Sequence, residues 1–486
     1  MAACDRRRTA VGVDGHSDVS RARLRLLRNR LARRADRAAA LRGARDAPRT
    51  WRTDRHADGS RGTRGDARRR ARTGLTIAPA RVPHAPRILF VTHNVPRHEG
   101  DAAGSFVLRL AVALQEQGAR VHIVAPGASG LPASDTLEGV RIDRVRYACD
   151  ARMTLAYTGT MAETVAGSWS GRLALLQLLA ATRRHVRRCL DHARRSGDPF
   201  DVVHVHWWFP SGLALLKTSR AGDPARVLTM HGSDVRLAEN KPVVHPVMRA
   251  VLGEAVIRTA VSGWLADLAR RLAPAGDIEV APMPVDVRHF DALPAVAGAD
   301  GQREGVLFVG RLNAQKGLAD LLRALALPAL ANHTLVVVGD GPDREALQAL
   351  AATLHVAPRI QWRGLLPQGA LVPLYRGARA VIMPSRGEGL GLVAVEAQLC
   401  ATPVVAYADG GLLDVVRPEH GGTLVPCGDI GALAEAIARV TADDHTVERL
   451  GSCARADMRA RFAPVAVARR YLALYANAAG LGARRP

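Results

Sequence analysis

Lysine is nearly absent from this strongly basic chain. Only three of the 68 basic residues are lysine, and the formal net charge is +23 over 486 residues. Arginine is the default cation here, so each lysine mildly indicates a place that needs a compact point charge. Lys217 and Lys241 lie in no motif, and chance retention is the better explanation of both. Lys316 lies in a glycine-bounded motif described below.

Paired cysteines, long apolar runs and acidic pairs of the Asp-any-Asp type are missing as well. Six scattered cysteines without a C-x-x-C pair argue against a zinc site or a disulfide framework and favour a reducing compartment. The longest apolar run, 173–181, contains Gln177 and falls short of the roughly 20 residues of a membrane span. We therefore expect a cytoplasmic protein whose site needs no metal.

A complete dinucleotide fingerprint is also missing. The stretch 336–347 (VVVGDGPDREAL) has Arg344 where the third glycine of that fingerprint would stand. This departure counts against a nicotinamide or flavin enzyme. We expect Asp340 and Gly341 to form a turn into the next helix.

The first 86 residues differ from the rest in composition. They hold 23 arginines and eight aspartates, a formal charge of +15, with no regular apolar period. Such a composition predicts a disordered tail. It could bind nucleic acid or an anionic membrane, and an over-extended start of the chain explains it equally well. We expect no specific nucleic-acid partner.

From residue 87 short apolar strands alternate with helical segments. Strands are predicted at 87–93, 120–126, 201–207, 226–232, 256–262 and 277–283, and after a Pro- and Gly-rich linker (291–304) at 305–311, 333–340, 359–364, 380–385 and 403–409. This βαβ alternation predicts parallel sheets covered on both faces. The expected division is a tail (1–86), a first α/β domain (87–290), the linker, a second α/β domain (305–463) and a crossover helix with a tail (464–486).

A glycine-rich turn between a buried strand and a helix, within 384–414, carries the most information. Glu388 and Glu396 are separated by seven residues, and glycines 387, 389 and 391 surround the first of them. Strand, glycine turn and helix place backbone N–H groups beside an anion, and carboxylates accept hydrogen bonds from hydroxyls. A ligand with central phosphates and hydroxyl-rich ends, such as a nucleotide sugar, fits this turn.

Three further motifs end strands of the same pattern. Arg311 and Lys316, in GRLNAQKG, offer two cations to a leaving diphosphate. His231, in HGSD, can bond a sugar hydroxyl or a phosphate, although a merely structural histidine has equal weight. Gly104 allows a close approach at a helix start. His204, His206, Trp207 and Trp208 are expected to be mostly structural.

Taken in order, these motifs resemble the retaining family 4 glycosyltransferases, from about residue 87 to residue 478. The resemblance implies a GT-B fold, in which two doubly wound Rossmann-like domains face each other across a cleft. Residues 87–290 would form the acceptor-side domain, and residues 305–463 would form the nucleotide-sugar-binding domain. It also implies transfer of a hexose from a nucleoside-diphosphate sugar to a hydroxyl of a glycan or glycolipid, with retention of configuration. No cofactor beyond the donor is expected.

The resemblance assigns roles to individual residues. His231, Glu388, Arg311 and Lys316 would form the catalytic centre, with Arg311 and Lys316 on the diphosphate. The donor hexose would lie on Glu388 and the N–H groups of residues 389–392, and Glu396 would bind the ribose. The donor-binding set is Gly104, Arg311, Lys316, Glu388, Gly389, Leu390, Gly391, Leu392 and Glu396.

Other interpretations remain open. GT-B folds also host sugar-nucleotide epimerases and phosphorylases, and a non-catalytic sugar-nucleotide-binding protein would keep the same motifs. The segment 172–195 is apolar at its start and cationic at its end. It could lie on an anionic leaflet at the inner face of a membrane, but such helices more often pack an apolar stripe on a sheet.

Overall fold

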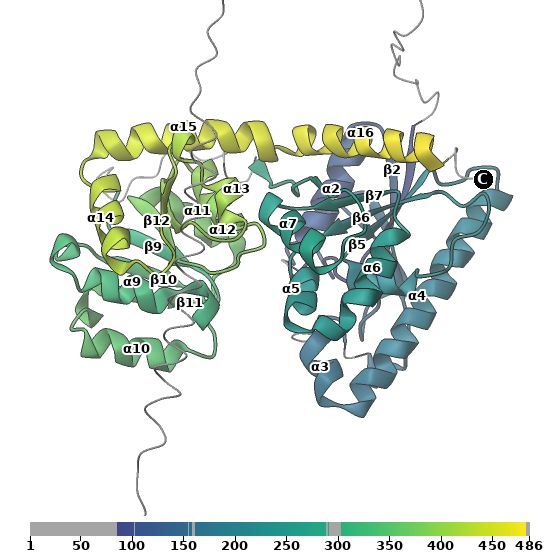
Figure 1. Cartoon of the computed structure of the whole chain (residues 1–486), viewed down its shortest axis with the longest axis horizontal. Helices are drawn as coiled ribbons and strands as arrows, with labels where there is room; N and C mark the ends of the chain where they lie inside the picture. The colour runs from purple at the N-terminus through teal and green to yellow at the C-terminus, as the bar shows by residue number, and fades with distance from the viewer. Residues whose placement is uncertain are drawn as a thin grey trace, which may run out of the picture. The chain divides into compact units, whose positions relative to one another are not determined.

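The computed structural model of the protein describes residues 85–101, 103–153, 155–157, 161–287, 290 and 303–482. The predictions for residues 1–84 of the tail and for residues 291–302 of the linker fall outside these residues. Within the described part, two open sheets follow each other along the chain, and Figure 1 labels their strands and helices. The predicted α/β class is therefore confirmed.

The first sheet has eight strands in the order β3-β4-β2-β1-β5-β6-β7-β8. All of its neighbours are parallel except β3, which runs antiparallel to β4. The central strand RILFV is buried, as expected of a strand covered on both faces. The strands are β1 (Arg87–Val91), β2 (Arg120–Pro126), β3 (Ser134–Leu137), β4 (Val140–Val145), β5 (Val202–His206), β6 (Ala225–Met230), β7 (Ile257–Ala260) and β8 (Glu279–Val280).

The pair β3 and β4 is absent from the predicted strand set. A two-residue turn, Glu138–Gly139, joins the two strands, and both residues have positive φ. Such turns match the twist of an antiparallel pair. Three of the four residues of the short strand β3 are polar and the strand lies at the edge of the sheet, so it lacks the apolar run that revealed the other strands.

The second sheet has six strands, all parallel, in the order β11-β10-β9-β12-β13-β14. Its last strand is too short to have been predicted, whereas the other five fall within the predicted segments. The strands are β9 (Val306–Val309), β10 (Leu335–Val338), β11 (Ile360–Gly364), β12 (Ala380–Met383), β13 (Val404–Tyr407) and β14 (Thr423–Val425).

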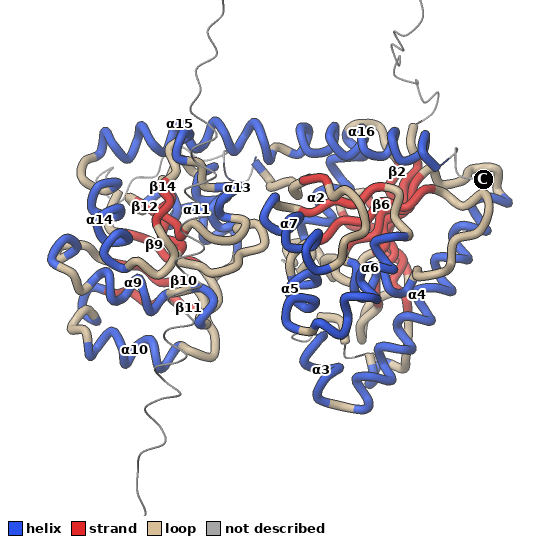
Figure 2. Tube along the Cα trace, viewed as in Figure 1, coloured by secondary structure: helices blue, strands red, loops and turns tan. Residues whose placement is uncertain are grey.

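Helices cover both faces of each sheet, and Figure 2 shows the strands enclosed between them. The first half holds α2 (Ser105–Glu116), α3 (Met161–Gly167), α4 (Trp169–Arg195), α5 (Ser233–Asn240), α6 (His245–Gly253) and α7 (Gly263–Leu272). The second half holds α9 (Leu318–Leu325), α10 (Arg344–Thr353), α11 (Gln368–Gly377), α12 (Leu392–Leu399), α13 (Leu412–Val415), α14 (Ile430–Val440), α15 (Asp444–Phe462) and α16 (Pro464–Gly482).

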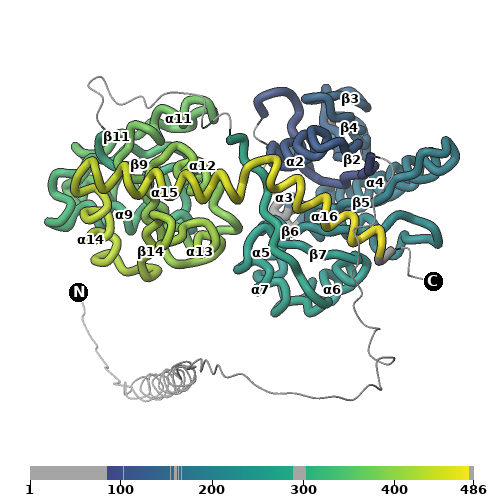
Figure 3. The backbone as a smooth tube through the Cα atoms, turned by 90° about the horizontal axis from the view of Figure 1, so that it is seen from above, coloured from purple at the N-terminus to yellow at the C-terminus, as the bar shows by residue number. Residues whose placement is uncertain are grey.

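The last helix returns to the first sheet. The Tyr471 hydroxyl donates to the carbonyl oxygen of Ala281 over 3.0 Å, and the Tyr475 hydroxyl lies 2.7 Å from His204 Nδ1. Figure 3 shows α16 crossing the strands of the first sheet, whereas α15 packs on α12 of the second half. In these contacts α16 packs on the first sheet, whereas the predicted division of the chain into domains stays a prediction.

Helix α4 has two different faces. A stripe that includes Leu178, Val186 and Leu190 is buried against the sheet, as the more common interpretation of this segment predicted. The opposite face exposes Trp169 (82%), Leu173 (52%) and Leu176 (63%) at the start of the helix. Among the described residues, no helix combines the length and the apolar character that crossing a bilayer requires.

Candidate active site

Most of the predicted site residues lie in segments at the carboxyl ends of four strands, whereas Leu392 and Glu396 lie in helix α12. Residues 94–104 follow β1, residues 231–232 follow β6, residues 310–317 follow β9, and residues 384–391 follow β12. The strand order reverses beside β1 in one sheet and beside β9 in the other. Ligands of open α/β sheets bind at such reversal points.

Two predicted charged residues meet directly. Lys316 Nζ lies 2.8 Å from Glu388 Oε2, and both side chains are mostly buried, with 19% and 16% exposed. The two residues are 72 positions apart in the sequence. Their contact joins the loop after β9 to the glycine turn after β12.

The loop that carries Lys316 is built around a tight crossing. Asn313 Oδ1 accepts a hydrogen bond from the Lys316 backbone N–H over 3.2 Å. The next residue, Gly317, has φ 70°, and a Cβ there would lie 2.0 Å from the carbonyl oxygen of Pro384. Only glycine fits this crossing, which fixes the lysine beside the β12 loop.

The glycine turn itself is held by hydrogen bonds at its backbone. The carbonyl oxygen of Glu388 accepts from Gly411 N–H over 2.6 Å, and that of Gly389 accepts from the Ser262 hydroxyl over 2.6 Å. Gly391 has φ 89° and precedes the first residue of α12, Leu392. The turn is therefore fixed from both halves of the chain before any donor arrives.

Glu396 lies inside α12 and is 8% exposed. Its carboxylate accepts hydrogen bonds from Gln368 Nε2 over 3.1 Å and from the Tyr375 hydroxyl over 3.0 Å. Burial raises the pKa of this carboxyl despite those two bonds. Arg109 of α2 in turn donates to Gln368 Oε1 over 3.1 Å. A carboxylate oxygen accepts more than one bond, so capacity for a ribose hydroxyl remains.

His231 belongs to a wall of aromatic rings. Its Nε2 lies 3.1 Å from His206 Nδ1, and its ring centroid lies 4.1 Å from that of Trp207 and 5.2 Å from that of Phe106. His93 packs edge-on against Trp207, with the ring centroids 4.3 Å apart. His206, which was expected to be structural, is thus in direct contact with His231, the candidate site residue.

Burial keeps this group of histidines neutral. It lowers the pKa of His93 to about 4 and that of His206 to about 3, and it lowers those of His204 and His231 well below the usual range. Near neutral pH the first sheet therefore presents an uncharged imidazole to the site.

The HGSD turn has its own anchor. Asp234 Oδ1 accepts from the backbone N–H groups of His231 (3.2 Å) and Gly232 (3.1 Å), and its Oδ2 accepts from Trp208 N–H (3.1 Å). Burial raises the pKa of Asp234 to about 6, against the opposing effect of these bonds. Trp207 and Trp208 are both buried core residues, as expected.

Gly104 lies at the start of α2 with φ 66°. A Cβ at this position would lie 2.5 Å from the carbonyl oxygen of Asn94, so packing of the β1 loop explains the glycine by itself. A role in binding the donor stays a prediction.

Two cavities adjoin these residues. One, of about 440 Å³, is lined by Arg311 and the loop residues 339–341, together with Leu365 and Leu371. The other, of about 230 Å³, is lined by Glu388, His231 and Phe106, together with residues 389–393. The Lys316 stem passes Gly310 on one side, and its ammonium group reaches Glu388 on the other.

Several residues of the site were not predicted from the sequence. Gln368, Tyr375 and Ser262 come from segments that carry no motif, and Phe106 reads as an ordinary apolar residue of an amphipathic helix. Asp234 alone carries a signal in the sequence, because an aspartate that follows a strand end within a few residues commonly caps the turn.

One group of described residues has the composition of a metal site. Donor atoms of Asp143, His185 and Cys189 lie within 4.8 Å of one another beside β4, away from the loops described above. Arg141 already lies 3.2 Å from Asp143 Oδ1, and His185 Nε2 lies 3.0 Å from its Oδ2. The negative charge of the aspartate is therefore largely compensated by the protein.

Comparison with known proteins agrees with this geometry. Residues 103–289 match the family model "Glycosyltransferase Family 4", and residues 290–457 match "Glycosyl transferases group 1". The chain is 33% identical over 427 residues to a D-inositol 3-phosphate glycosyltransferase of Xylanimonas cellulosilytica, which covers 81% of this chain and 97% of the relative. It is 31% identical over 368 residues to a 2-deoxystreptamine glucosyltransferase of Streptomyces kanamyceticus, covering 70% and 90%.

Solved structures show the same fold. Sucrose-phosphate synthase of Thermosynechococcus elongatus superposes with a TM-score of 0.61 at 25% identity, over 81% of this chain and 98% of that one. The Anabaena protein HepE in complex with UDP-glucose superposes with a TM-score of 0.57 at 18% identity, over 80% and 99%. The chain therefore belongs to glycosyltransferase family 4 and is a transferase with the GT-B fold.

Proposed function

We propose that the protein transfers a hexose from a nucleoside-diphosphate sugar to a hydroxyl acceptor with retention of anomeric configuration. The observation that carries this proposal is the contact between Lys316 and Glu388. A cation suited to a leaving diphosphate and a carboxylate suited to sugar hydroxyls lie 2.8 Å apart. Glu388 lines the smaller cavity, and Gly310, which the Lys316 stem passes, lines the larger one. A donor with a diphosphate between a nucleoside and a sugar has this same order of groups.

The donor would occupy both cavities. The nucleoside fits the larger one beside Arg311 and Gly341, whose lining is mostly apolar with backbone groups at its edge. The hexose fits the smaller one against Glu388 and residues 389–392. Glu396 would accept hydrogen bonds from the ribose. The diphosphate then meets Arg311 and Lys316.

Binding of the donor would replace the contact between Lys316 and Glu388 with contacts from each residue to the donor. Lys316 and Glu388 neutralise each other in the absence of ligand. The phosphates would take over the ammonium group, and the hexose hydroxyls would take over the carboxylate. Neither charge is then left unpaired in a mostly buried place, which would otherwise be costly.

The transfer breaks the bond between the anomeric carbon and the phosphate oxygen and forms a bond from that carbon to the acceptor oxygen. The acceptor proton passes to the departing phosphate oxygen on the same face of the sugar. Arg311 and Lys316 stabilise the negative charge that grows on the diphosphate. Electrostatic stabilisation of this kind is usually the largest single contribution to the rate enhancement of an enzyme.

His231 would act as a neutral hydrogen-bonding group. His206 Nε2 is buried without a partner, which is tolerable for an acceptor but not for a donor, so His206 carries its proton on Nδ1. That proton faces His231 Nε2, so His231 carries its own proton on Nδ1. The imidazole can therefore donate to a sugar hydroxyl but adds no charge beside the reacting carbon.

The relatives suggest the acceptor class. Their names identify a phosphorylated inositol and 2-deoxystreptamine as acceptors, and both are polyhydroxylated rings. We propose a hydroxyl of such a ring, free or within a glycan or glycolipid. A cytoplasmic location, with α4 resting on an anionic membrane through Trp169, Leu173 and Leu176, is part of this proposal.

Calorimetric titration with UDP-, GDP- and ADP-sugars tests the donor site. We expect one nucleotide class to bind the wild type and to bind Glu396→Ala at least tenfold more weakly. Glu435→Ala, in the exposed part of α14, serves as the matched control and should bind like the wild type. If no nucleotide sugar binds the folded wild type, the proposed function is wrong.

Product analysis separates the alternatives. A transferase releases nucleoside diphosphate only when an acceptor is present, beyond slow hydrolysis. An epimerase would convert the sugar nucleotide without any acceptor, and a non-catalytic binding protein would return it unchanged.

A further inference from the structure

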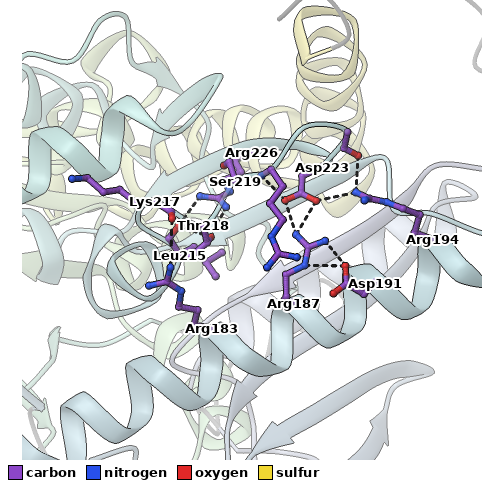
Figure 4. A network of polar contacts seen from close by, with 12 residues as sticks. Arg183, Arg187, Asp191, Arg194, Leu215, Lys217, Thr218, Ser219, Asp223 and Arg226 are labelled. Carbon is purple, nitrogen blue, oxygen red and sulfur yellow. Dashed lines mark hydrogen bonds and ion pairs between the residues drawn. The ribbon is translucent and has the colours of Figure 1, made fainter. Parts of the chain in front are cut away.

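A third cavity, of about 380 Å³, lies on the first half of the chain between α4 and the loop 215–220. Arg183, Arg184, Arg187 and Arg188 face it from α4. Lys217, Arg220 and Arg226 face it from the loop and from the start of β6. Figure 4 shows most of these side chains and the contacts between them.

Only two of these seven cations are paired with carboxylates. Arg187 bonds Asp191 and Asp223, the latter at 2.8 Å, and Arg226 lies 3.0 Å from Glu254. The other five form no ion pair with any carboxylate of the described residues: Arg183, Arg184, Arg188, Lys217 and Arg220. The cavity therefore holds a surplus of positive charge.

The cations that line one cavity repel one another, so the surrounding fold must hold them in place. The backbone of Lys217 shows how it does so. This residue has φ 55°, a conformation that costs energy for any side chain other than glycine. Its N–H donates to Glu254 Oε1 over 3.2 Å, and its carbonyl oxygen accepts from Arg183 Nη2. Lys217 was expected to be a chance survivor, but it lines the cavity.

The rest of the lining is not charged. Val186, Leu190 and Leu215 form an apolar floor, and the hydroxyl groups of Thr218 and Ser219 lie among the cations. A floor of this kind accommodates a neutral ring or chain, whereas the cations and hydroxyls suit oxyanions.

This cavity is separate from the candidate active site. Arg226 lies at the amino end of β6, and His231 follows its carboxyl end. Five residues of strand correspond to about 16 Å at about 3.3 Å per residue. A ligand in this cavity therefore does not occupy the donor pockets.

We propose that this cavity binds a small anion that carries two or more phosphate groups on an uncharged body. Arginine forks match phosphate oxygens in pairs, and Lys217 supplies a compact charge. The phosphates could belong to a free metabolite or to the headgroup of an anionic phospholipid, since α4 also exposes apolar residues at its start. The proposal does not depend on the transferase proposal.

The first experiment uses inorganic triphosphate as the probe in the double variant Arg311→Ala/Lys316→Ala, which removes the cations of the donor site. Calorimetry at low and at physiological salt should show one bound triphosphate. Adding Arg184→Gln/Arg188→Gln should weaken that binding at least tenfold, because both side chains are exposed and unpaired in the described residues.

A matched control tests whether net charge alone explains the loss. Arg439→Gln/Arg449→Gln removes two exposed arginines of the second half and should leave the affinity within twofold. The proposal would be overturned if the two double substitutions weakened triphosphate binding equally. It would also be overturned if no triphosphate bound at either salt concentration.

A second arm separates the two sources of phosphate. Vesicles of phosphatidylcholine with cardiolipin, a lipid whose headgroup carries two phosphates, are sedimented with each variant. Loss of sedimentation on Arg184→Gln/Arg188→Gln, with triphosphate competing, supports a lipid headgroup. Triphosphate binding without vesicle binding supports a free metabolite. Vesicle binding that is unaffected by both triphosphate and the substitution contradicts the proposal for lipids.

Discussion

The two halves of the chain bring opposite kinds of chemistry to the candidate site. The second half contributes Arg311, Lys316 and Glu388, all charged and carried by loops. The first half contributes His231 within a wall of buried rings, whose imidazoles burial keeps neutral. Charge thus gathers where a diphosphate would lie, and neutral hydrogen bonding where a sugar would react.

This division has a physical reason. A cation near the anomeric carbon would oppose the positive charge that develops there as the phosphate leaves, whereas a cation at the phosphate favours departure. In the proposed reaction, the desolvation of His231 and the charge on Lys316 would therefore act together from two sides. The predictions below test each side in turn.

The largest expected effect is on the charged side. Lys316→Ala should lower kcat/KM by about 10²- to 10³-fold, the cost of removing one preorganised group that stabilises a leaving charge. Lys241→Ala is the matched control, because this lysine is exposed and outside both cavities. The measurement is release of nucleoside diphosphate with acceptor present. Equal rates for the two variants would remove Lys316 from the mechanism.

On the neutral side, the position of α2 depends on Gly104. Gly104→Ala adds a Cβ 2.5 Å from a carbonyl oxygen at φ 66°, whereas Gly100→Ala adds one at φ 80° with nothing within 4 Å. Both variants place a Cβ on a residue with positive φ, which strains the backbone, but only Gly104→Ala also brings that Cβ into a clash. Urea unfolding should show Gly104→Ala less stable than Gly100→Ala by about 1–3 kcal/mol. Similar losses would mean that the β1 loop yields to the methyl group.

The neutral wall should also make stability depend on pH. The folded-state pKa of His93 is lowered from 6.5 to about 4, so the unfolded chain binds a proton there first as the pH falls. Stability from this group is therefore full above pH 6.5 and is lost on acidification towards pH 4. His206 acts in the same direction, whereas Asp234, with its pKa raised to about 6, opposes it.

His93→Gln isolates one share of this dependence. Between pH 7 and pH 5 the wild type should lose about 2 kcal/mol more than the variant, from about 1.4 kcal/mol for each pH unit below 6.5. Urea unfolding at both pH values gives the difference, in which the contribution of Asp234 cancels. An equal loss in both proteins would mean that His93 is not protonated on unfolding.

Much of the fold was predictable because each parallel strand is a short apolar run. The strands around Phe90 and Phe308 were predicted for that reason, whereas β3 was missed because three of its four residues are polar and it lies at a sheet edge. Arg311, Lys316 and Glu388 could be identified because the backbone segments that cross closely beside them require glycines, and these glycines are visible in the sequence as motifs.

The supporting residues could not be predicted in the same way. Tyr375 and Gln368 reach Glu396 from another helix, and Ser262 reaches Gly389 from the first half of the chain. Such contacts depend on how distant segments pack, and neither composition nor spacing records them. The cavity beside Lys217 is a further case, since its cations come from a helix and a loop about 30 residues apart.

The smallest expected effect concerns the link between the two halves. Asp414, from the second half, accepts from the Gly263 N–H at the start of α7 over 2.9 Å. A carboxylate at a helix start contributes about 0.3–1 kcal/mol, so Asp414→Asn should cost no more than that and leave donor affinity unchanged. Ser262 caps the same helix through Leu265 N–H but also holds the Gly389 carbonyl.

Ser262→Ala should therefore cost similar stability and, unlike Asp414→Asn, weaken binding of the donor. Thermal unfolding and donor calorimetry on both variants separate the two effects. If Asp414→Asn weakens the donor as much as Ser262→Ala does, the placement of α7 matters to the site rather than the hydrogen bond to the glycine turn. The first half of the chain would then affect donor binding through the position of α7, and not through the hydrogen bond from Ser262 to Gly389.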